Sequence, residues 1–180
     1  MTPITIQQTA EQAKLAFELH THAEIESVRL LKSRVTSRSL LEPLRGPIAL
    51  TLKHRARQAS APKGLLRLEI SFHLSGVEEK AAPAQGSGRG REPLALVECT
   101  WEVDYRLAEG YQPPAEAVKA FKDGNAVFNC WPYFREYVQN TITRMNLPPL
   151  TIPLLRLAPK PPKKPAAPPR PSQPAERAEE

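Results

Sequence analysis

The sequence predicts an α+β fold in which a four-stranded antiparallel sheet is packed by one long helix. Two stretches alternate apolar and polar residues with the two-residue period of a strand, and two earlier stretches are rich in β-forming residues. A further stretch carries an apolar stripe with the period of a helix. With 180 residues, of which 41% are hydrophobic, the chain is expected to form one domain with a sizeable core.

The clearest strands are "LLRLEISFHL" at residues 65–74 and "LVECTWEVDYRL" at residues 96–107. Each has one apolar and one polar side, which is typical of a strand that lies between a core and water. The stretches at residues 23–37 and 48–54 are expected to complete an antiparallel sheet that is apolar on one face. The apolar sides of the two clearest strands are formed by Leu66, Leu68, Ile70, Phe72 and Leu74, and by Val97, Cys99, Trp101, Val103, Tyr105 and Leu107.

The stretch at residues 127–145 is predicted to be the helix that covers this apolar face. Asn125 stands where a helix N-cap is favoured, and Pro148 and Pro149 are expected to end the helix because proline lacks an amide donor. Pro132 lies inside the stretch, so we expect either a kink or a helix that begins there. The apolar stripe consists of Val127, Trp131, Phe134, Val138, Ile142 and Met145.

A second flank of the same helix is too apolar to face bulk water. It is formed by Cys130, Tyr133, Tyr137 and Thr141. We expect a further surface to cover these side chains, and self-association is the simplest way to supply one. The four residues are therefore predicted to lie in an oligomer interface of a tetramer, or at least of a stable dimer.

The end of the chain differs from the rest in composition. Residues 156–180 hold six of the 25 basic and three of the 19 acidic residues, so they carry half of the net charge of +6. Eight prolines between Pro159 and Pro174 disfavour helix and sheet. We expect a folded domain at residues 1–157 and a disordered, Pro- and Lys-rich tail at residues 158–180. Residues 78–93, rich in Gly, Ala and Ser, are expected to form a mobile loop.

The sequence lacks the patterns of several functional classes. No segment approaches the roughly 20 apolar residues of a membrane helix, and the N-terminus lacks signal-peptide features, so a cytoplasmic protein is expected. Cys99 and Cys130 have no metal-binding or redox spacing and are expected to be buried thiols. His20 and His22 lack a third ligand nearby. Because no local motif combines a nucleophile, a base and an oxyanion donor, we expect no enzyme activity, no cofactor and no metal.

Two motifs resemble those of the SecB family of export chaperones. "WPYFRE" at residues 131–136 looks like the aromatic-Pro-Tyr-x-Arg-Glu motif that opens the family's long helix. "LPPLTIP" at residues 147–153 resembles the proline-bearing segment that follows it. With four preceding strands in the family's order, the resemblance covers most of residues 25–154. It implies a dimer of dimers that binds unfolded polypeptides without ATP and keeps them competent for export or free of aggregation.

The chain departs from the usual SecB pattern in two ways. Only Leu154, Leu155 and Leu157 precede the proline-rich tail, where members of the family usually continue into a second C-terminal helix. Typical members are also acidic, and the export motor SecA is thought to dock on their acidic surface. This chain is basic, with a pI of about 9.5, which puts SecA in question as a partner. The stand-alone and toxin–antitoxin-associated relatives, which serve other clients, are the other comparison that the resemblance suggests.

Client binding is expected at aromatic residues along the margin of the sheet and the helix. The dry faces of four strands are wider than one helix, about 10 Å across, can cover, and uncovered apolar surface usually marks a binding site. The candidates are Phe72, Trp101, Tyr105, Phe121 and Phe128.

The main alternative function is that of a basic protein associated with nucleic acid or the ribosome. The pI and the Lys- and Arg-bearing tail suggest it. The polar sides of the two clearest strands argue against it, because they mix Arg67 and Arg106 with carboxylates that would repel phosphate. These carboxylates belong to Glu69, Glu98, Glu102 and Asp104.

Overall fold

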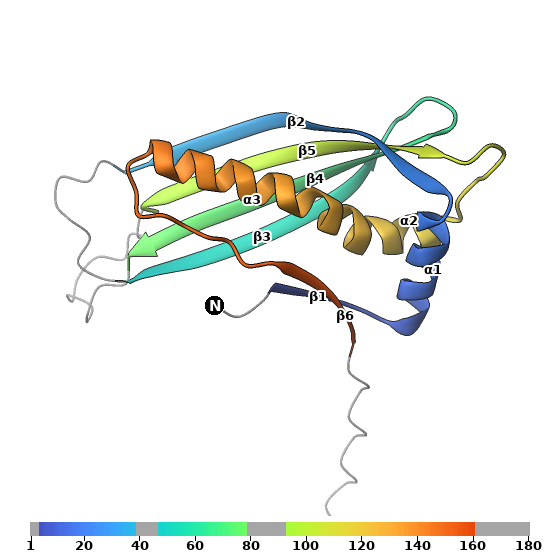
Figure 1. Cartoon of the computed structure of the whole chain (residues 1–180), viewed down its shortest axis with the longest axis horizontal. Coiled ribbons are helices and arrows are strands. Elements are labelled where there is room, and N and C mark those ends of the chain that lie inside the picture. The colour runs from blue at the N-terminus through green and yellow to red at the C-terminus, as the bar shows by residue number, and fades with distance from the viewer. Residues whose placement is uncertain (1–3, 39–46, 79–92, 161–180) are drawn as a thin grey trace, which may run out of the picture.

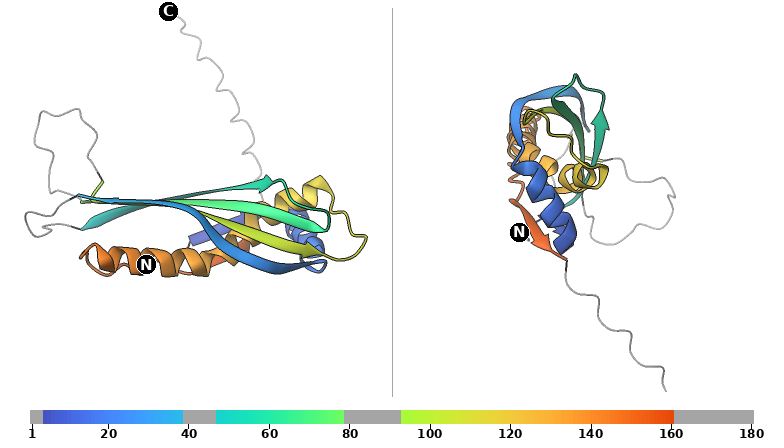
Figure 2. Two further views of the ribbon diagram at one scale, coloured as in Figure 1. Left: turned by 90° about the horizontal axis from the view of Figure 1, so that it is seen from above. Right: turned by 90° about the vertical axis from the view of Figure 1, so that its right-hand side faces the viewer.

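A computed structural model describes residues 4–38, 47–78 and 93–160, and it consists of a sheet with a helical layer on one face (Figures 1 and 2). The sheet contains four antiparallel strands in the order β2-β5-β4-β3. Their bounds are β2 (Ala23–Ser37), β3 (Ile48–Ala59), β4 (Leu65–Glu78) and β5 (Ala95–Leu107). The long helix, α3 (Val127–Arg144), packs on the central strands β4 and β5. The predicted fold class is therefore confirmed for the single chain, while its assembly as a dimer of dimers stays a prediction.

The strand order places β2 and β3 at the two edges of the sheet. β3, β4 and β5 pair with their neighbours in sequence, whereas β2 pairs with β5, so the chain crosses from one edge to the other between β2 and β3. The pairing of β2 with β5 shifts register twice, between Ile25 and Ser27 and again between Leu30 and Lys32. Each shift inserts an extra residue into β2, as in a β-bulge.

The core lies between the dry face of the sheet and α3. Leu68, Ile70 and Val103 are fully buried on the central strands. The ring of Phe72 on β4 stacks on that of Phe134 on α3, with centroids 4.3 Å apart. The predicted helix stripe is confirmed, since all its members are buried except Met145, which is partly buried.

The helix begins earlier than predicted. α2 (Ala115–Phe121) continues through a π-helical segment, η1 (Lys122–Ala126), directly into α3. Asn125 is therefore not an N-cap, because it lies within a continuous run of helical backbone and α3 has no side-chain cap. α3 also begins before Pro132, which lies exposed inside it. Consecutive prolines at the start of α2 supply the helix initiation that the sequence analysis assigned to Asn125.

The predicted end of the helix is confirmed. α3 ends at Arg144, and Asn146 adopts a positive φ of 56°, which asparagine tolerates better than most residues. Leu147, Pro148 and Pro149 then lead the chain back along α3. Among the described residues, no helix is both long and apolar enough to cross a membrane.

The two ends of the described chain form a small sheet that the sequence analysis did not anticipate. β1 (Ile4–Gln8) pairs in parallel with β6 (Leu155–Pro159), which extends past the expected domain end at Leu157. Between β1 and β2 lies α1 (Ala10–His20), whose capping box joins Thr9 and Gln12. The predicted mobile loop and disordered tail fall almost wholly outside the described residues.

Gln8 joins this small sheet to the helical layer. Its side chain is buried, and its Nε2 donates a hydrogen bond of 3.3 Å to the carbonyl of Ala120. Its backbone carbonyl accepts a hydrogen bond from the amide of Lys160 at 2.7 Å. A Cβ atom on Gly124 would overlap Gln8 Nε2 and lie 2.9 Å from Gln8 Cδ. Glycine at position 124 thus makes room for the Gln8 side chain against η1.

We predict that Gly124→Ala lowers the free energy of unfolding by about 1–3 kcal/mol, because the added methyl group meets a buried side chain. This is the reverse of the ordinary gain of about 1 kcal/mol for replacing glycine by alanine within a helix. In a Gln8→Ala background the same substitution should be neutral or stabilising. Chemical denaturation of the four proteins of this double-mutant cycle measures the difference, and equal effects in both backgrounds would refute the steric explanation.

Candidate functional site

Large apolar side chains are exposed on the helix side of the sheet. α3 lies along the middle of the sheet (Figure 2), so the dry sides of the edge strands are only partly covered. Ile25 and Leu30 on β2 and Leu50 on β3 are 48%, 39% and 41% exposed. Ile25 and Leu30 pair across the sheet with Tyr105 and Trp101 of its dry face. Leu50 pairs with Gly76, which lies on the same side of β4 as the dry-face residues. The uncovered apolar surface therefore has two parts, one on each side of α3.

On the β2 side, aromatic side chains of α3 extend the apolar surface. The ring of Tyr133 lies 5.7 Å from that of Trp101, and the ring of Tyr137 lies 6.3 Å from it. Leu30 is the cross-strand partner of Trp101. Trp101 is nearly buried beneath these side chains, whereas Tyr133 is 44% exposed. We call Leu30, Trp101, Tyr133 and Tyr137 the tyrosine patch.

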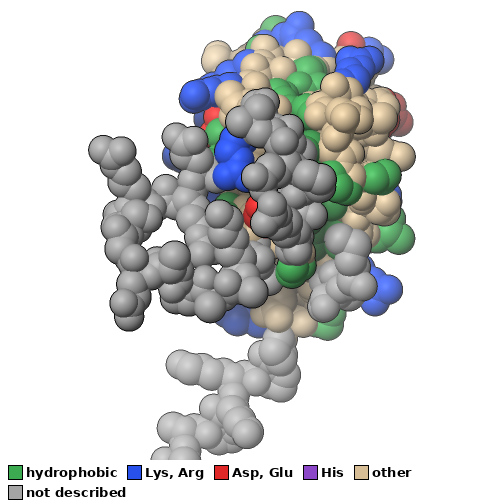
Figure 3. All heavy atoms as spheres, turned by 90° about the vertical axis from the view of Figure 1, so that its left-hand side faces the viewer, with side chains coloured by type: hydrophobic (Ala, Val, Ile, Leu, Met, Phe, Trp, Pro, Cys, Tyr) green, Lys and Arg blue, Asp and Glu red, His purple; other side chains and the backbone are tan. Residues whose placement is uncertain are grey.

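On the β3 side, an apolar groove of about 100 Å³ lies between the sheet and the segment that follows α3. Gly76 lines the groove. A Cβ there would lie 3.2 Å from Ile48 and 3.3 Å from Leu50, so the absence of a side chain at Gly76 keeps this part of the groove open. Hydrophobic side chains reach the surface at this end of the molecule (Figure 3). We call it the end groove, and its apolar walls include Leu50, Leu74, Leu94, Ile142, Leu147 and Leu150.

The wall formed by the returning segment is held in place by two side chains of α3. The indole Nε1 of Trp131 donates to the carbonyl of Pro153 at 3.0 Å. One turn later, the guanidinium Nε of Arg135 donates to the carbonyl of Ile152 at 2.8 Å. Both acceptors lie in a proline-bearing stretch that has few backbone partners of its own. The "WPYFRE" and "LPPLTIP" motifs are therefore in direct contact.

A further pair of exposed apolar residues borders this segment. Phe128 stands one turn before Trp131 on α3 and is 47% exposed. Leu154 follows the Pro153 carbonyl that Trp131 binds and is 63% exposed. The two residues place apolar surface on the flank of α3 along which the chain returns.

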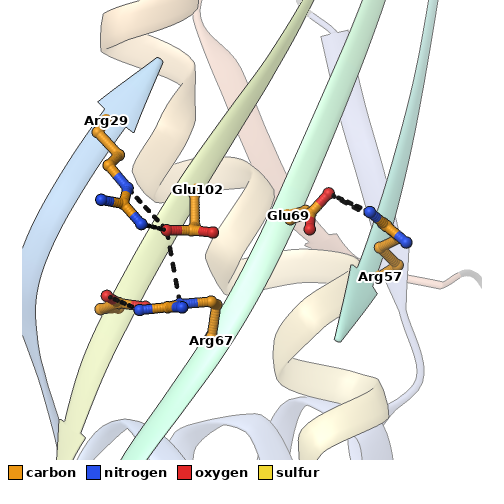
Figure 4. Close-up of polar contacts among 6 residues, drawn as sticks. Arg29, Arg57, Arg67, Glu69 and Glu102 are labelled. Atoms are coloured by element: carbon orange, nitrogen blue, oxygen red, sulfur yellow. Dashed lines mark hydrogen bonds and ion pairs between the residues drawn. The ribbon is translucent and has the colours of Figure 1, made fainter. Parts of the chain in front are cut away.

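The opposite face of the sheet is polar and carries a ladder of ion pairs (Figure 4). Arg67 on β4 binds both carboxylate oxygens of Asp104 on β5, at 2.7 and 2.8 Å. Arg29 on β2 binds Glu102, and Arg57 on β3 binds Glu69 at 2.9 Å through its Nε. The three carboxylates are buried at the centre of the sheet, and each has an arginine partner. The hydrogen bonds from Arg67 hold the pKa of Asp104 below its ordinary value.

The sequence is similar to two curated proteins over most of its length. The chain is 26% identical over 163 residues to the SecB-like chaperone Rv1957 of Mycobacterium tuberculosis strain H37Rv, covering 86% of this chain and 90% of the relative. It is equally similar to the SecB-like chaperone MT2006 of Mycobacterium tuberculosis strain CDC 1551, with 86% and 90% covered. A search of protein-family models found no match.

The fold is also that of a solved SecB-like structure. The solved structure of the Mycobacterium tuberculosis SecB-like chaperone Rv1957 in complex with a ChAD peptide from the Rv1956 HigA1 antitoxin superposes with a TM-score of 0.66 at 22% identity, covering 81% of this chain and 99% of that one. The chain is therefore similar to SecB-like chaperones in sequence and shares the fold of one of them. The resemblance stated from two short motifs is thus supported by the sequence as a whole and by the fold.

Four of the five client-binding candidates lie in the core of the protomer. Phe72 stacks within the aromatic cluster, and Trp101 lies under the tyrosine patch. Tyr105 and Phe121 meet edge to face at 5.0 Å, and both are fully buried. The helical layer covers these four side chains, so they are buried in the protomer instead of standing exposed at the margin of the sheet. Phe128 is the candidate that solvent reaches, and client contact by any of the five stays a prediction.

The predicted interface residues are divided between the core and the surface of the protomer. Cys130 is fully buried, and burial raises the pKa of its thiol to about 12. Cys99 is also a buried free thiol. Tyr133 is exposed, while Tyr137 and Thr141 are partly buried. Three of the four therefore present surface on the flank of α3 that faces β2, and their role in an interface stays a prediction.

Residues that sequence reasoning missed form most of the apolar surface. Leu30, Leu50 and Leu154 were not singled out, although each stands on an apolar side of an edge strand or beside a proline. The missing information was which strands lie at the edges of the sheet. Among the described residues, no group of three or more His, Cys, Asp or Glu side chains could hold a metal ion.

We predict that Arg67→Gln lowers Tm by about 5 °C, because it leaves Asp104 and part of Glu102 without a compensating charge. Arg106→Gln is the matched control, since Arg106 pairs with Glu26 at the exposed rim, and its Tm should fall by less than about 2 °C. The pKa of Asp104 is lowered by folding, so its contribution is present above the ordinary carboxyl pKa and is lost as pH falls through the lowered value. The difference between the two variants should therefore shrink in acid. Equal Tm losses at neutral pH would contradict this account.

Proposed function

We propose that this SecB-like protein is an ATP-independent chaperone that binds non-native polypeptides and keeps them from aggregating. The observation that carries the proposal is apolar surface on both sides of α3, including a formed groove, in a chain similar to SecB-like chaperones. A native monomer buries such surface, whereas a holding chaperone needs it. The buried free thiols Cys99 and Cys130 suit a reducing compartment, and we place the protein in the cytoplasm.

The end groove and the Phe128–Leu154 flank are the proposed client-binding surface. The end groove accepts one or two apolar side chains, and its walls are mostly aliphatic. A single such contact is weak, but one unfolded chain can occupy both places, and the corresponding places of a second protomer, at once. Release of a client is then slow although each contact is modest. Native proteins escape because their apolar segments are buried.

The tyrosine patch is the proposed self-association surface. It is continuous across β2 and α3, and it includes Tyr133 and Tyr137, which were predicted to lie in an interface. Aromatic side chains that are partly buried in the free protomer lose little entropy when a partner covers them. A second copy placed there would cover Leu30 and Tyr133 and leave the end groove open. We propose a dimer built in this way as the unit of a dimer of dimers.

The proposed clients are unfolded proteins, with export as one use of the activity. The solved relative is in complex with an antitoxin peptide, so its ligand is a polypeptide. The basic pI of the present chain does not favour SecA as its partner. A dedicated client, such as an unfolded segment of a toxin–antitoxin protein, fits the similarity better than general export.

We predict that Leu50→Asp strongly reduces protection of a chemically unfolded model protein from aggregation, by at least about fivefold in effective concentration. The new charge would lie in the end groove, where bound apolar segments would desolvate it. Thr51→Asp is the matched control, because Thr51 is the next residue on β3 and faces the polar side of the sheet. Light scattering of the aggregating client measures protection.

Tm must be measured alongside, so that loss of folding is not mistaken for loss of binding. Leu50 is already 41% exposed, so Leu50→Asp should leave Tm nearly unchanged. Equal protection by the two variants would place client binding outside the end groove. Full protection by Leu50→Asp, and also by a Phe128→Asp variant, would overturn the whole proposed surface.

A double substitution, Leu30→Lys with Tyr133→Lys, should dissociate the assembly. In the proposed dimer, the two new cations of one copy would repel those of the other across the tyrosine patch, and apolar contacts there would be lost. Size-exclusion chromatography with light scattering should then shift the mass towards the 20.0 kDa of one chain. Phe17→Lys is the control, since Phe17 on α1 is even more exposed, at 66%, and lies outside the tyrosine patch. A wild-type protein that is already monomeric at micromolar concentration would refute self-association.

A further inference from the structure

The helix-free face of the sheet has a hollow of about 420 Å³ between its two edge strands. The walls are Lys32 and Arg34 of β2 and Lys53 and Arg55 of β3. The floor is formed by Ser71 and His73 of β4 and by Glu98 and Thr100 of β5. We call this hollow the cationic saddle. It lies on the opposite face of the sheet from the end groove.

The four cations of the walls have no counter-charge among the residues that the structure describes. All four are exposed, and none forms an ion pair or side-chain hydrogen bond with another residue of the described ranges. The floor offers one carboxylate, that of Glu98, which is already paired with His73 at 3.0 Å. The saddle therefore has a marked excess of positive charge.

The neighbouring row of the same face shows that this excess is local. There the edge strands also supply cations, Arg29 and Arg57, but the central strands supply Glu102 and Glu69 to bind them (Figure 4). In the saddle, the central strands supply the hydroxyls of Ser71 and Thr100 at the corresponding place, 2.9 Å apart. The described part of the sheet thus leaves these cations available to an acidic partner.

The spacing of the walls matches an extended polypeptide. Lys32 and Arg34 are two residues apart on a strand, so their side chains leave the sheet about 7 Å apart, as do those of Lys53 and Arg55. The two walls are separated by three strand spacings, or about 14 Å. In an extended chain laid between them, alternate side chains point to opposite walls and repeat every 7 Å or so. Four consecutive acidic residues would direct two carboxylates to each wall.

We propose that the cationic saddle binds an extended segment of a partner protein that carries about four consecutive acidic residues. The carboxylates pair with Lys32 and Arg34 on one side and with Lys53 and Arg55 on the other. Ser71 and Thr100 hydrogen-bond each other, and one hydroxyl proton of the pair is free to donate to a backbone carbonyl of the segment. Binding at this face is separate from, and compatible with, occupation of the end groove.

A nucleic acid fits the saddle less well than an acidic peptide. Phe72, the aromatic residue that borders the saddle, directs its ring to Phe134 on the other side of the sheet, so it offers no face for a base to stack on. The carboxylates of Glu98, Glu69 and Glu102 would lie along the path of a continuous phosphate backbone. A short acidic run can avoid the neighbouring row, whereas a longer polyanion cannot.

The test uses the full chain and a fluorescein-labelled peptide, Gly-Ser-Glu-Glu-Glu-Glu-Ser-Gly, at low ionic strength. Fluorescence anisotropy should show at least about tenfold weaker binding to Lys32→Glu/Lys53→Glu than to the wild type, because each reversal replaces attraction with repulsion. Lys14→Glu/Lys63→Glu changes the net charge equally at exposed positions outside the saddle, and it should weaken binding by less than about twofold. A peptide with the same four glutamates separated by paired glycines should bind the wild type more weakly.

Several results would overturn the proposal. Equal losses in the two double variants would show that net charge, not the saddle, attracts the peptide. A higher affinity for an eight-nucleotide oligothymidylate than for the peptide would assign the saddle to nucleic acid. Loss of peptide binding in Leu50→Asp would move the peptide to the end groove. If the double reversal unfolds, as circular dichroism would show, Lys32→Gln/Lys53→Gln is expected to give a smaller loss in the same direction, and unchanged affinity would refute the site.

Discussion

The structure depends on one geometric constraint, namely that a single helix covers a sheet wider than itself. α3 has 18 residues and is about 27 Å long, so it can run along the central strands, but its width of about 10 Å spares the dry sides of β2 and β3. The two central strands consequently build the core with Phe134 and Val138. The edge strands keep Leu30 and Leu50 near water. The end groove and the tyrosine patch therefore both exist because α3 covers the dry face of the sheet incompletely.

The ends of the chain compensate for the lack of a second covering helix. The segment after α3 turns back along it, tied by the side chains of Trp131 and Arg135, and then pairs with β1. Gln8 connects that pairing to the π-helical segment through Ala120, in the space that Gly124 leaves. The residues that carry the resemblance to SecB-like chaperones therefore have a structural role, because they join α3 to the segment that follows it.

Elements with a periodic pattern of apolar residues could be predicted from the sequence, whereas elements that form through contacts between distant residues could not. β4, β5 and the stripe of α3 repeat every two or 3.6 residues, and each was placed within a few positions. The pairing of β1 with β6 joins residues about 150 positions apart, and five-residue strands show too few repeats to be recognised. The capping box of Thr9 and Gln12 was a readable local signal for α1. For Tyr105, alternation predicted which face of the sheet it occupies, but its burial against Phe121 depended on where α2 would lie.

The two extra residues in β2 decide which side chains each face of the sheet receives. Because side chains alternate, Arg29 and Lys32 could not share the polar face if the strand between them were regular, and the bulge after Leu30 restores them to it. If the same residues paired regularly, with no bulge, Lys32 and Arg34 would turn towards the apolar side, and Ser33 and Val35 would come out to the polar one. The two bulges of β2 therefore determine, together with its composition, which side chains each surface of the protein presents at this edge.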